Sequence, residues 1–199
     1  MRFRNTFRLS LALCFVLTGT LLPASVYAKT ARAGLTVTGT VVGISGRLAG
    51  RTRPFTLRVN RYTSADDTAR LNAALRSGGE EELMNVLSKL DAGRISVGTG
   101  VGVTANVVIA APAAEGGTKL TVLFQRNVNF FELRAGTRSS DYRFGYAEIY
   151  LDGRGRGEGT FIPAAKVRLQ GDTWVVEDFG EFPARLMGLR ASGSVSNAR

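Results

Sequence analysis

The chain has 199 residues, of which 44% are hydrophobic, and it carries 26 lysines and arginines against 16 acidic residues. This length and apolar content suit one domain with a packed core. The sequence has no histidine and a single cysteine, Cys14, which excludes imidazole-dependent catalysis and imidazole metal ligands. Because Cys14 lies in a segment that we expect to be removed, thiol nucleophiles, thiolate zinc sites and disulfides are excluded as well.

The first 28 residues predict a signal peptide. Arg2, Arg4 and Arg8 form a basic start, an apolar run follows from Leu9 to Leu22, and Ala28 ends a cleavage site of small residues. The run is shorter than the ~20 apolar residues of a spanning helix. We therefore expect cleavage after Ala28 and export to a periplasm or the extracellular space. Losing three arginines would lower the net charge from +10 to +7.

Two strands and a helical hairpin are predicted next. Apolar residues alternate with polar ones from Leu35 and again from Phe55, which is typical of strands with one buried face. After Tyr62 the period becomes helical, with Ser64 as a hydroxyl N-cap and an acidic residue, Asp67, three positions later. Ser77-Gly78-Gly79 ends this helix, and Glu80-Glu81-Glu82 begins a second one that runs to Gly93.

The rest of the chain predicts strands joined by tight turns. They span Arg94–Val97, Val101–Ala110, Lys119–Arg126, Tyr142–Leu151, Gly159–Leu169, Thr173–Asp178 and Ala184–Ala191. Short connections require antiparallel neighbours. The expected fold is α+β and mainly antiparallel β, a curled sheet or partly closed β-barrel with one helical hairpin. A two-layer β-sandwich is the alternative. We expect one domain over residues 29–191 and a loose tail over 192–199.

The strongest candidate site is a polar stretch that follows Phe130-Phe131. Its expected ligand-binding residues are Arg134, Arg138, Asp141, Tyr142 and Arg143. The arginines could hold a carboxylate or phosphate as bidentate donors, with Tyr142 as a flat wall. The alternative is that these charges pair internally and tie a long connection onto the sheet.

Other motifs predict structure rather than chemistry. Asp152-Gly153-Arg154-Gly155-Arg156 has arginines at positions where a calcium loop needs oxygen ligands, so it predicts a hairpin tip. The glycines from Gly98 to Gly102 precede a strand, so no helix N-terminus would receive a pyrophosphate. Tyr142–Leu151 has two apolar-leaning faces, which favours a central strand under the helical hairpin.

Three stretches of the mature chain carry a resemblance to known proteins, and they run from Tyr62 to Ile95, from Phe131 to Tyr142 and from Gly157 to Val167. They resemble a family of secreted bacterial β-rich proteins with no assigned activity. The resemblance implies an exported domain and adds no substrate or site.

Three functional hypotheses follow. The first is a non-enzymatic domain, without catalytic residues, cofactor or metal, that binds an anionic ligand or a partner in the cell envelope. The second is a carboxylate-dependent polysaccharide hydrolase. Its candidate acids are Glu148, Glu158, Asp172, Glu177, Asp178 and Glu181. The third is adhesion to a polyanion, an acidic glycan or nucleic acid, through net charge, with nucleic acid the less favoured partner. The sequence leaves the oligomeric state open.

Overall fold

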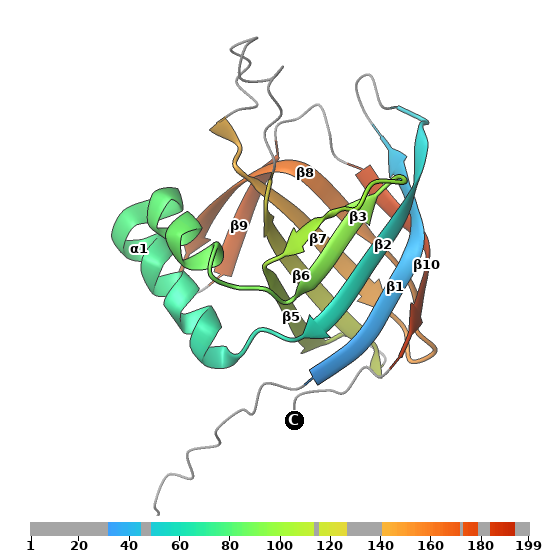
Figure 1. The fold of residues 1–199 in the computed structure, drawn as a ribbon, viewed down its shortest axis with the longest axis horizontal. Coiled ribbons are helices and arrows are strands. Elements are labelled where there is room, and N and C mark those ends of the chain that lie inside the picture. The colour runs from blue at the N-terminus through green and yellow to red at the C-terminus, as the bar shows by residue number, and fades with distance from the viewer. Residues whose placement is uncertain are drawn as a thin grey trace, which may run out of the picture.

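The computed structural model describes residues 32–44, 49–113, 116–126, 141–171, 173–178 and 184–193. Within these ranges the chain forms ten strands and one helix, α1 (Ala65–Leu87) (Figure 1). The strands are β1 (Arg32–Gly43), β2 (Thr52–Arg61), β3 (Gly93–Val97), β4 (Val103–Ala105), β5 (Val107–Pro112), β6 (Thr118–Gln125), β7 (Phe144–Leu151), β8 (Arg156–Gln170), β9 (Thr173–Asp178) and β10 (Ala184–Ser192). The predicted signal peptide lies outside the described residues.

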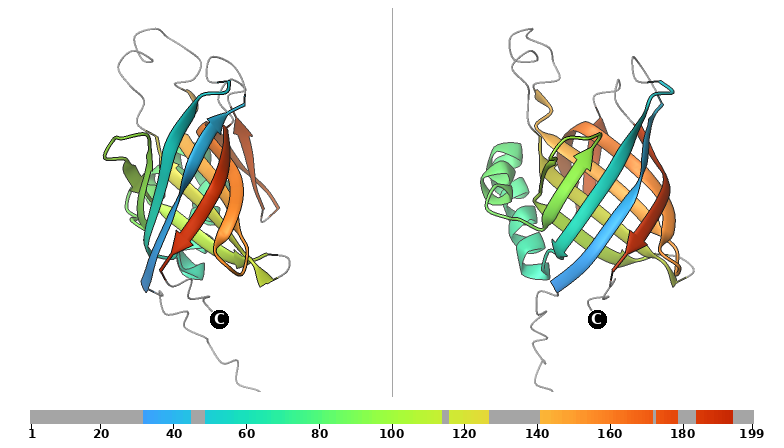
Figure 2. Two further views of the ribbon diagram at one scale, coloured as in Figure 1. Left: turned by 90° about the vertical axis from the view of Figure 1, so that its right-hand side faces the viewer. Right: turned by 45° about the vertical axis from the view of Figure 1, so that its right-hand side comes forward.

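All ten strands belong to one sheet, in the order β4-β3-β2-β1-β10-β8-β7-β6-β5, with β9 paired to β8. Every pairing between these named strands is antiparallel. The sheet curls without closing, as both views in Figure 2 show. These observations confirm the predicted fold class and the curled sheet rather than the two-layer sandwich.

The two ends of the sheet are formed by one continuous stretch of chain that changes direction at Asn106. Sequence periodicity predicts a single strand there, but the structure contains β4 and β5 separated by this residue. The buried Asn106 amide nitrogen donates to the carbonyls of Leu87 and Leu90, at 3.1 and 3.0 Å. Its carbonyl oxygen accepts from the backbone N–H of Gln125 at 2.8 Å. Asn106 therefore joins the end of α1 to β6 where the sheet fails to close.

The space inside the curl is filled by apolar side chains that alternate along the strands. The rings of Phe124 and Phe161 stack with centroids 6.2 Å apart, and Phe55 meets Phe161 edge-on at 6.4 Å. Gly145, the cross-strand partner of Phe124, leaves room for this cluster, because a Cβ at that position would overlap the Phe124 ring. Aromatic packing here depends on a glycine in the neighbouring strand.

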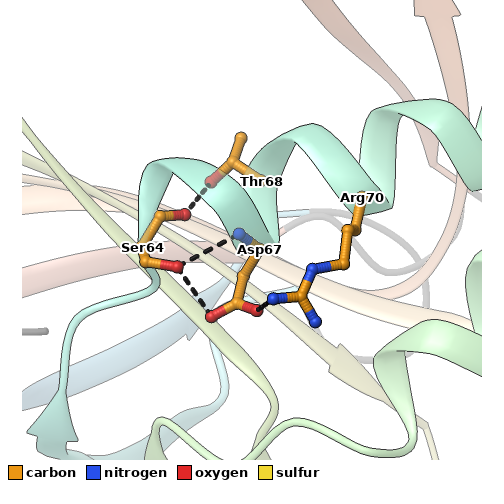
Figure 3. Close-up of polar contacts among 4 residues, drawn as sticks. All are labelled: Ser64, Asp67, Thr68 and Arg70. Atoms are coloured by element: carbon orange, nitrogen blue, oxygen red, sulfur yellow. Dashed lines mark hydrogen bonds and ion pairs between the residues drawn. The ribbon is translucent and has the colours of Figure 1, made fainter. Parts of the chain in front are cut away.

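Helix α1 begins with the predicted cap. The Ser64 hydroxyl oxygen accepts from the backbone N–H of Asp67 at 3.1 Å, and the hydroxyl donates to the Asp67 carboxylate at 2.8 Å (Figure 3). This reciprocal pair stabilises the first turn. Of the predicted helical hairpin, the structure forms one helix that is kinked at Gly79, where φ is 61° and ψ is −147°. Gly79 adopts this left-handed φ without the steric cost of a side chain.

Helix α1 packs on the outer face of the sheet. Its buried leucines, among them Leu71 and Leu83, contact Phe144 and Tyr146 of β7 and Val167 of β8. Alternate residues of β7, such as Ile149, face the interior of the curl. The prediction that β7 is a central strand under the helical segment is thus confirmed. In the described part of the chain, no helix combines the length and apolar character needed to cross a membrane.

Strand β8 is long and changes its partners along its length. It pairs with β10 over Arg156–Phe161 and with β9 over Ala165–Gln170. Its pairing with β7 ends at Ala165. Beyond Ala165 the edge that faced β7 is therefore open, and the backbone N–H of Val167 donates instead to the Glu80 carboxylate of α1 at 2.8 Å. The kinked helix satisfies a strand edge that would otherwise carry an unpaired donor.

Candidate functional site

The structure describes three of the five residues predicted to bind a ligand. Arg134 and Arg138 lie outside the described residues. Asp141 is exposed, while Tyr142 and Arg143 are partly buried immediately before β7. The ligand-binding role of all five residues stays a prediction.

Tyr142 and Arg143 are anchored to neighbouring elements. The Tyr142 hydroxyl donates to Glu177 of β9 at 3.2 Å, and its backbone carbonyl accepts from the Arg126 guanidinium at 2.9 Å. Arg143 donates to Glu81 of α1 at 2.5 Å. These two residues are thus engaged by protein groups, as the alternative expectation has it.

A hollow of about 540 Å³ lies beside these contacts, between the kink of α1 and the end of β8. We call it the kink hollow. Its lining residues come from α1, from the end of β8 and from Gly171 after β8. The lining residues are Leu75, Arg76, Gly79, Glu80, Lys166, Val167, Arg168, Leu169 and Gly171. A cavity of this volume suits a small-molecule ligand.

The kink hollow is basic. Among the described residues that line it, Arg76, Lys166 and Arg168 are cationic and Glu80 is the carboxylate. Glu80 keeps its negative charge while it accepts the Val167 N–H, and Arg168 is paired with Glu177, but the lining still holds three cationic residues against one carboxylate. The arrangement favours an anion over a neutral or cationic ligand.

Glu177 connects the predicted segment with the kink hollow. One of its carboxylate oxygens accepts from Tyr142, and the other pairs with Arg168 at 3.0 Å. The ammonium nitrogen of Lys166 lies 4.7 Å from the centre of the Tyr142 ring, within the range of a cation–π interaction. A ligand in the kink hollow would therefore meet side chains whose positions depend on Tyr142.

A second hollow, of about 510 Å³, lies under the C-terminal end of α1. Its lining is polar and includes Lys89, Asp91, Arg94 and Asn106. Both polar ends of the Asn106 side chain are engaged by protein groups, and Arg94 donates to backbone carbonyls at 3.4 Å. This lining holds two cationic residues, Lys89 and Arg94, against one carboxylate, Asp91, so it is less basic than the lining of the kink hollow.

A polar cluster on the outer face of β6 and β7 centres on Glu148. Its carboxylate accepts from the Tyr146 hydroxyl at 2.7 Å, from the Tyr150 hydroxyl, and pairs with Lys119 at 2.8 Å. Burial raises the pKa of Glu148, but hydrogen bonds from Lys119, Tyr150 and Tyr146 outweigh it and leave the pKa below its usual value. Burial, followed by the hydrogen bond to Glu148, raises the pKa of Tyr146.

The described carboxylates do not form an acid and base pair. Glu148 is held ionised, so it is a poor proton donor at neutral pH. Glu177 is engaged by Tyr142 and Arg168. Glu158 is exposed on β8, diagonal to Glu148 across the sheet. Within the described ranges, no three acidic side chains gather as a metal site would require. The Asp172 and Glu181 positions and the Asp178 side chain lie outside the described part.

No family model, curated protein or solved structure matches this chain. The resemblance to secreted bacterial proteins therefore stays a prediction. Chemistry and geometry are the grounds on which a function can be proposed.

Reasoning from sequence missed most of the kink hollow. Arg76, Lys166 and Arg168 are scattered over two elements and only the fold brings them together. A signal was present in β8, where Lys166 and Arg168 alternate with Val167 and Leu169. That alternation places two cations on one face of a strand. Glu80 and Glu81 were expected only to begin a second helix, whereas both also reach other elements.

Proposed function

We propose that this chain is an exported, non-enzymatic binding protein that holds a small anionic ligand in the kink hollow. The observation that carries the proposal is the set of cationic side chains, Arg76, Lys166 and Arg168, around a cavity of ligand size. A bound carboxylate or phosphate would receive charge-assisted hydrogen bonds from these groups. The partly apolar lining from Leu75 and Leu169 would contact the rest of the ligand.

Binding of monosaccharide-sized probes tests this function. Galacturonate and glucose 1-phosphate supply a carboxylate and a phosphate, and glucose is the neutral control. Titration calorimetry should detect binding of at least one anion and none of glucose. The K166Q/R168Q double variant should bind at least about tenfold more weakly, because each lost contact involves a charged partner.

The matched control is R70Q/K89Q, which removes the same charge from exposed positions outside the kink hollow. Its affinity should equal that of the native protein. Absence of anion binding by the native chain, or equal weakening in both double variants, would refute the proposal. In the same assay the double variant R134A/R138A tests whether the two arginines predicted from sequence contribute to anion affinity.

Export is tested separately. The N-terminal sequence of the protein recovered from the periplasm or medium should begin at Lys29, as the cleavage site after Ala28 predicts. Recovery of the chain in the cytoplasm with Met1 intact would contradict this part of the proposal.

A further inference from the structure

The outer face of the sheet carries a row of exposed arginines, which begins at Arg94 beside the C-terminal end of α1. It is formed by β3, β2, β1, β10 and the first half of β8, and Figure 2 (left) looks onto several of these strands. Apolar residues of these strands point into the curl, so their polar partners point outward. The exposed arginines of this surface, which we call the basic face, are Arg58, Arg94, Arg156, Arg185 and Arg190.

Two pairs of these arginines lie directly opposite each other. Arg58 of β2 is the cross-strand partner of Arg94 of β3, and Arg190 of β10 is the partner of Arg156 of β8. Like charges placed directly opposite destabilise a sheet. Within the described ranges no ion pair joins these four arginines to an acidic side chain, but Arg94 donates to two backbone carbonyls, and the backbone hydrogen bond and charge of Arg156 lower the pKa of Asp152. Glu158 is the acidic residue among the outward residues of these strands.

The cations are interleaved with hydroxyl groups. Arg58 is followed across the sheet by Thr36 and Ser192, and Arg190 by Thr38 and Thr56. Adjacent strands lie about 4.8 Å apart, so the two arginine pairs with β1 between them span roughly 19 Å. The two arginine pairs lie on neighbouring rows, two residues apart along β1, so a ligand that crosses the strands diagonally would meet one pair, then hydroxyls, then the other pair.

We propose that the basic face binds a linear acidic polysaccharide. Arginine pairs would hold its carboxylate or sulfate groups, and the threonine hydroxyls would exchange hydrogen bonds with sugar hydroxyls. The face curves with the sheet, so a flexible chain can follow it, whereas a flat bilayer or a stiff DNA duplex touches only its crest. The described outward residues of these strands include no aromatic side chain on which nucleic acid bases could stack.

This inference does not depend on the kink hollow, which is built from α1 and the second half of β8. Loss of small-anion binding in K166Q/R168Q would leave the basic face intact. The two proposals can therefore fail separately.

The test uses the variant R58Q/R190Q, which removes one arginine from each like-charge pair. Affinity for polygalacturonate and dextran sulfate, measured by biolayer interferometry, should fall about tenfold, and its dependence on salt should become weaker. The melting temperature should stay the same or rise, since a repulsive pair is lost at each site. A merely structural role for these arginines would lower both affinity and melting temperature.

The control R70Q/K89Q has the same net charge as R58Q/R190Q but keeps all five arginines of the basic face. Its affinity for both polysaccharides should therefore exceed that of R58Q/R190Q. Neutral dextran should not bind. Three results would overturn the inference: no binding of either acidic polysaccharide by the native protein, equal loss in both variants, or tighter binding to a 30-nucleotide single strand, a DNA duplex or phosphatidylglycerol vesicles.

Discussion

Glu80 and Val167 lie 87 positions apart in the chain, and the Glu80 carboxylate accepts the backbone N–H of Val167 at 2.8 Å. The contact places a helix side chain where a neighbouring strand would otherwise supply an acceptor. It also fixes the kinked part of α1 against β8, and so shapes the kink hollow.

Substitution E80A should destabilise the protein by about 1–3 kcal/mol, because the Val167 N–H loses its acceptor in a buried position. Urea unfolding at pH 7 measures this. The control E82A removes an exposed carboxylate two residues further along the same element and should change stability by less than about 0.5 kcal/mol. Equal effects of the two substitutions would contradict the structural role of Glu80.

Substitution N106A should cost about 3 kcal/mol, because the carbonyls of Leu87 and Leu90 and the N–H of Gln125 all lose a partner. Thermal and urea unfolding provide the measurement. Asn85, exposed on α1 and bonded to Glu82, is the matched control, and N85A should be nearly neutral. A mild effect of N106A would show that the join between α1 and β6 contributes little.

Acid should weaken the fold through Glu148. Its pKa is lowered in the folded state, so its stabilising contribution is present above the unfolded value of about 4.3 and is lost as pH falls through the folded value. E148Q should therefore be less stable than the native protein at pH 7, with a difference that narrows below about pH 4. Unfolding curves from pH 7 to 3 measure it, and a constant difference would refute the role of the charge.

Raising the pH above about 10 should destabilise the fold through Tyr146. Its pKa is raised by burial and by Glu148, so its contribution is complete below the unfolded value of about 10 and is lost as pH rises toward the folded value. Y146F should be about 1 kcal/mol less stable at pH 7, since one hydrogen bond is lost. Above about pH 10 the difference should shrink. Stability measured at pH 7, 10 and 11 checks this, and a difference that grows would contradict it.

A double-mutant cycle tests the fit between Gly145 and Phe124. A methyl group at position 145 would overlap the Phe124 ring, so G145A should cost about 1–3 kcal/mol through overpacking. The same substitution in an F124L background should cost less, because the smaller side chain leaves space. Additive effects of the two substitutions would show that the glycine is not required by the ring.

Most helices and strands could be predicted from the sequence, because hydrophobic periodicity and capping residues are local features of the chain. The Ser64 cap and the β9 boundaries match the structure, and the strand beginning at Phe144 packs on both faces as its two apolar faces indicated. The break at Asn106 was not predictable, because apolar residues continue on either side of it and only distant carbonyls explain it. Gly79 was recognised as an interruption, but whether it would form a hairpin or a kink depends on packing against β8.

The candidate site was harder to predict. Tyr142 and Arg143 stood out by composition, yet their partners Glu177 and Glu81 lie 35 and 62 positions away. Lys166 and Arg168 appeared as ordinary outward residues of a strand. The positive environment around the kink hollow arises from folding, since no stretch of sequence contains all of its cations.

The pairing of β1 with β10 has a consequence for how the chain reaches its folded state. These strands join residues near position 40 to residues near position 187 in the middle of the sheet, with β2 on one side and β8 on the other. A polypeptide delivered N-terminus first, whether from a ribosome or across a membrane, cannot unite the two halves until its last strand has arrived. Contacts between such distant positions slow folding, so the nascent chain would expose two unpaired edges to chaperones or to aggregation during that delay.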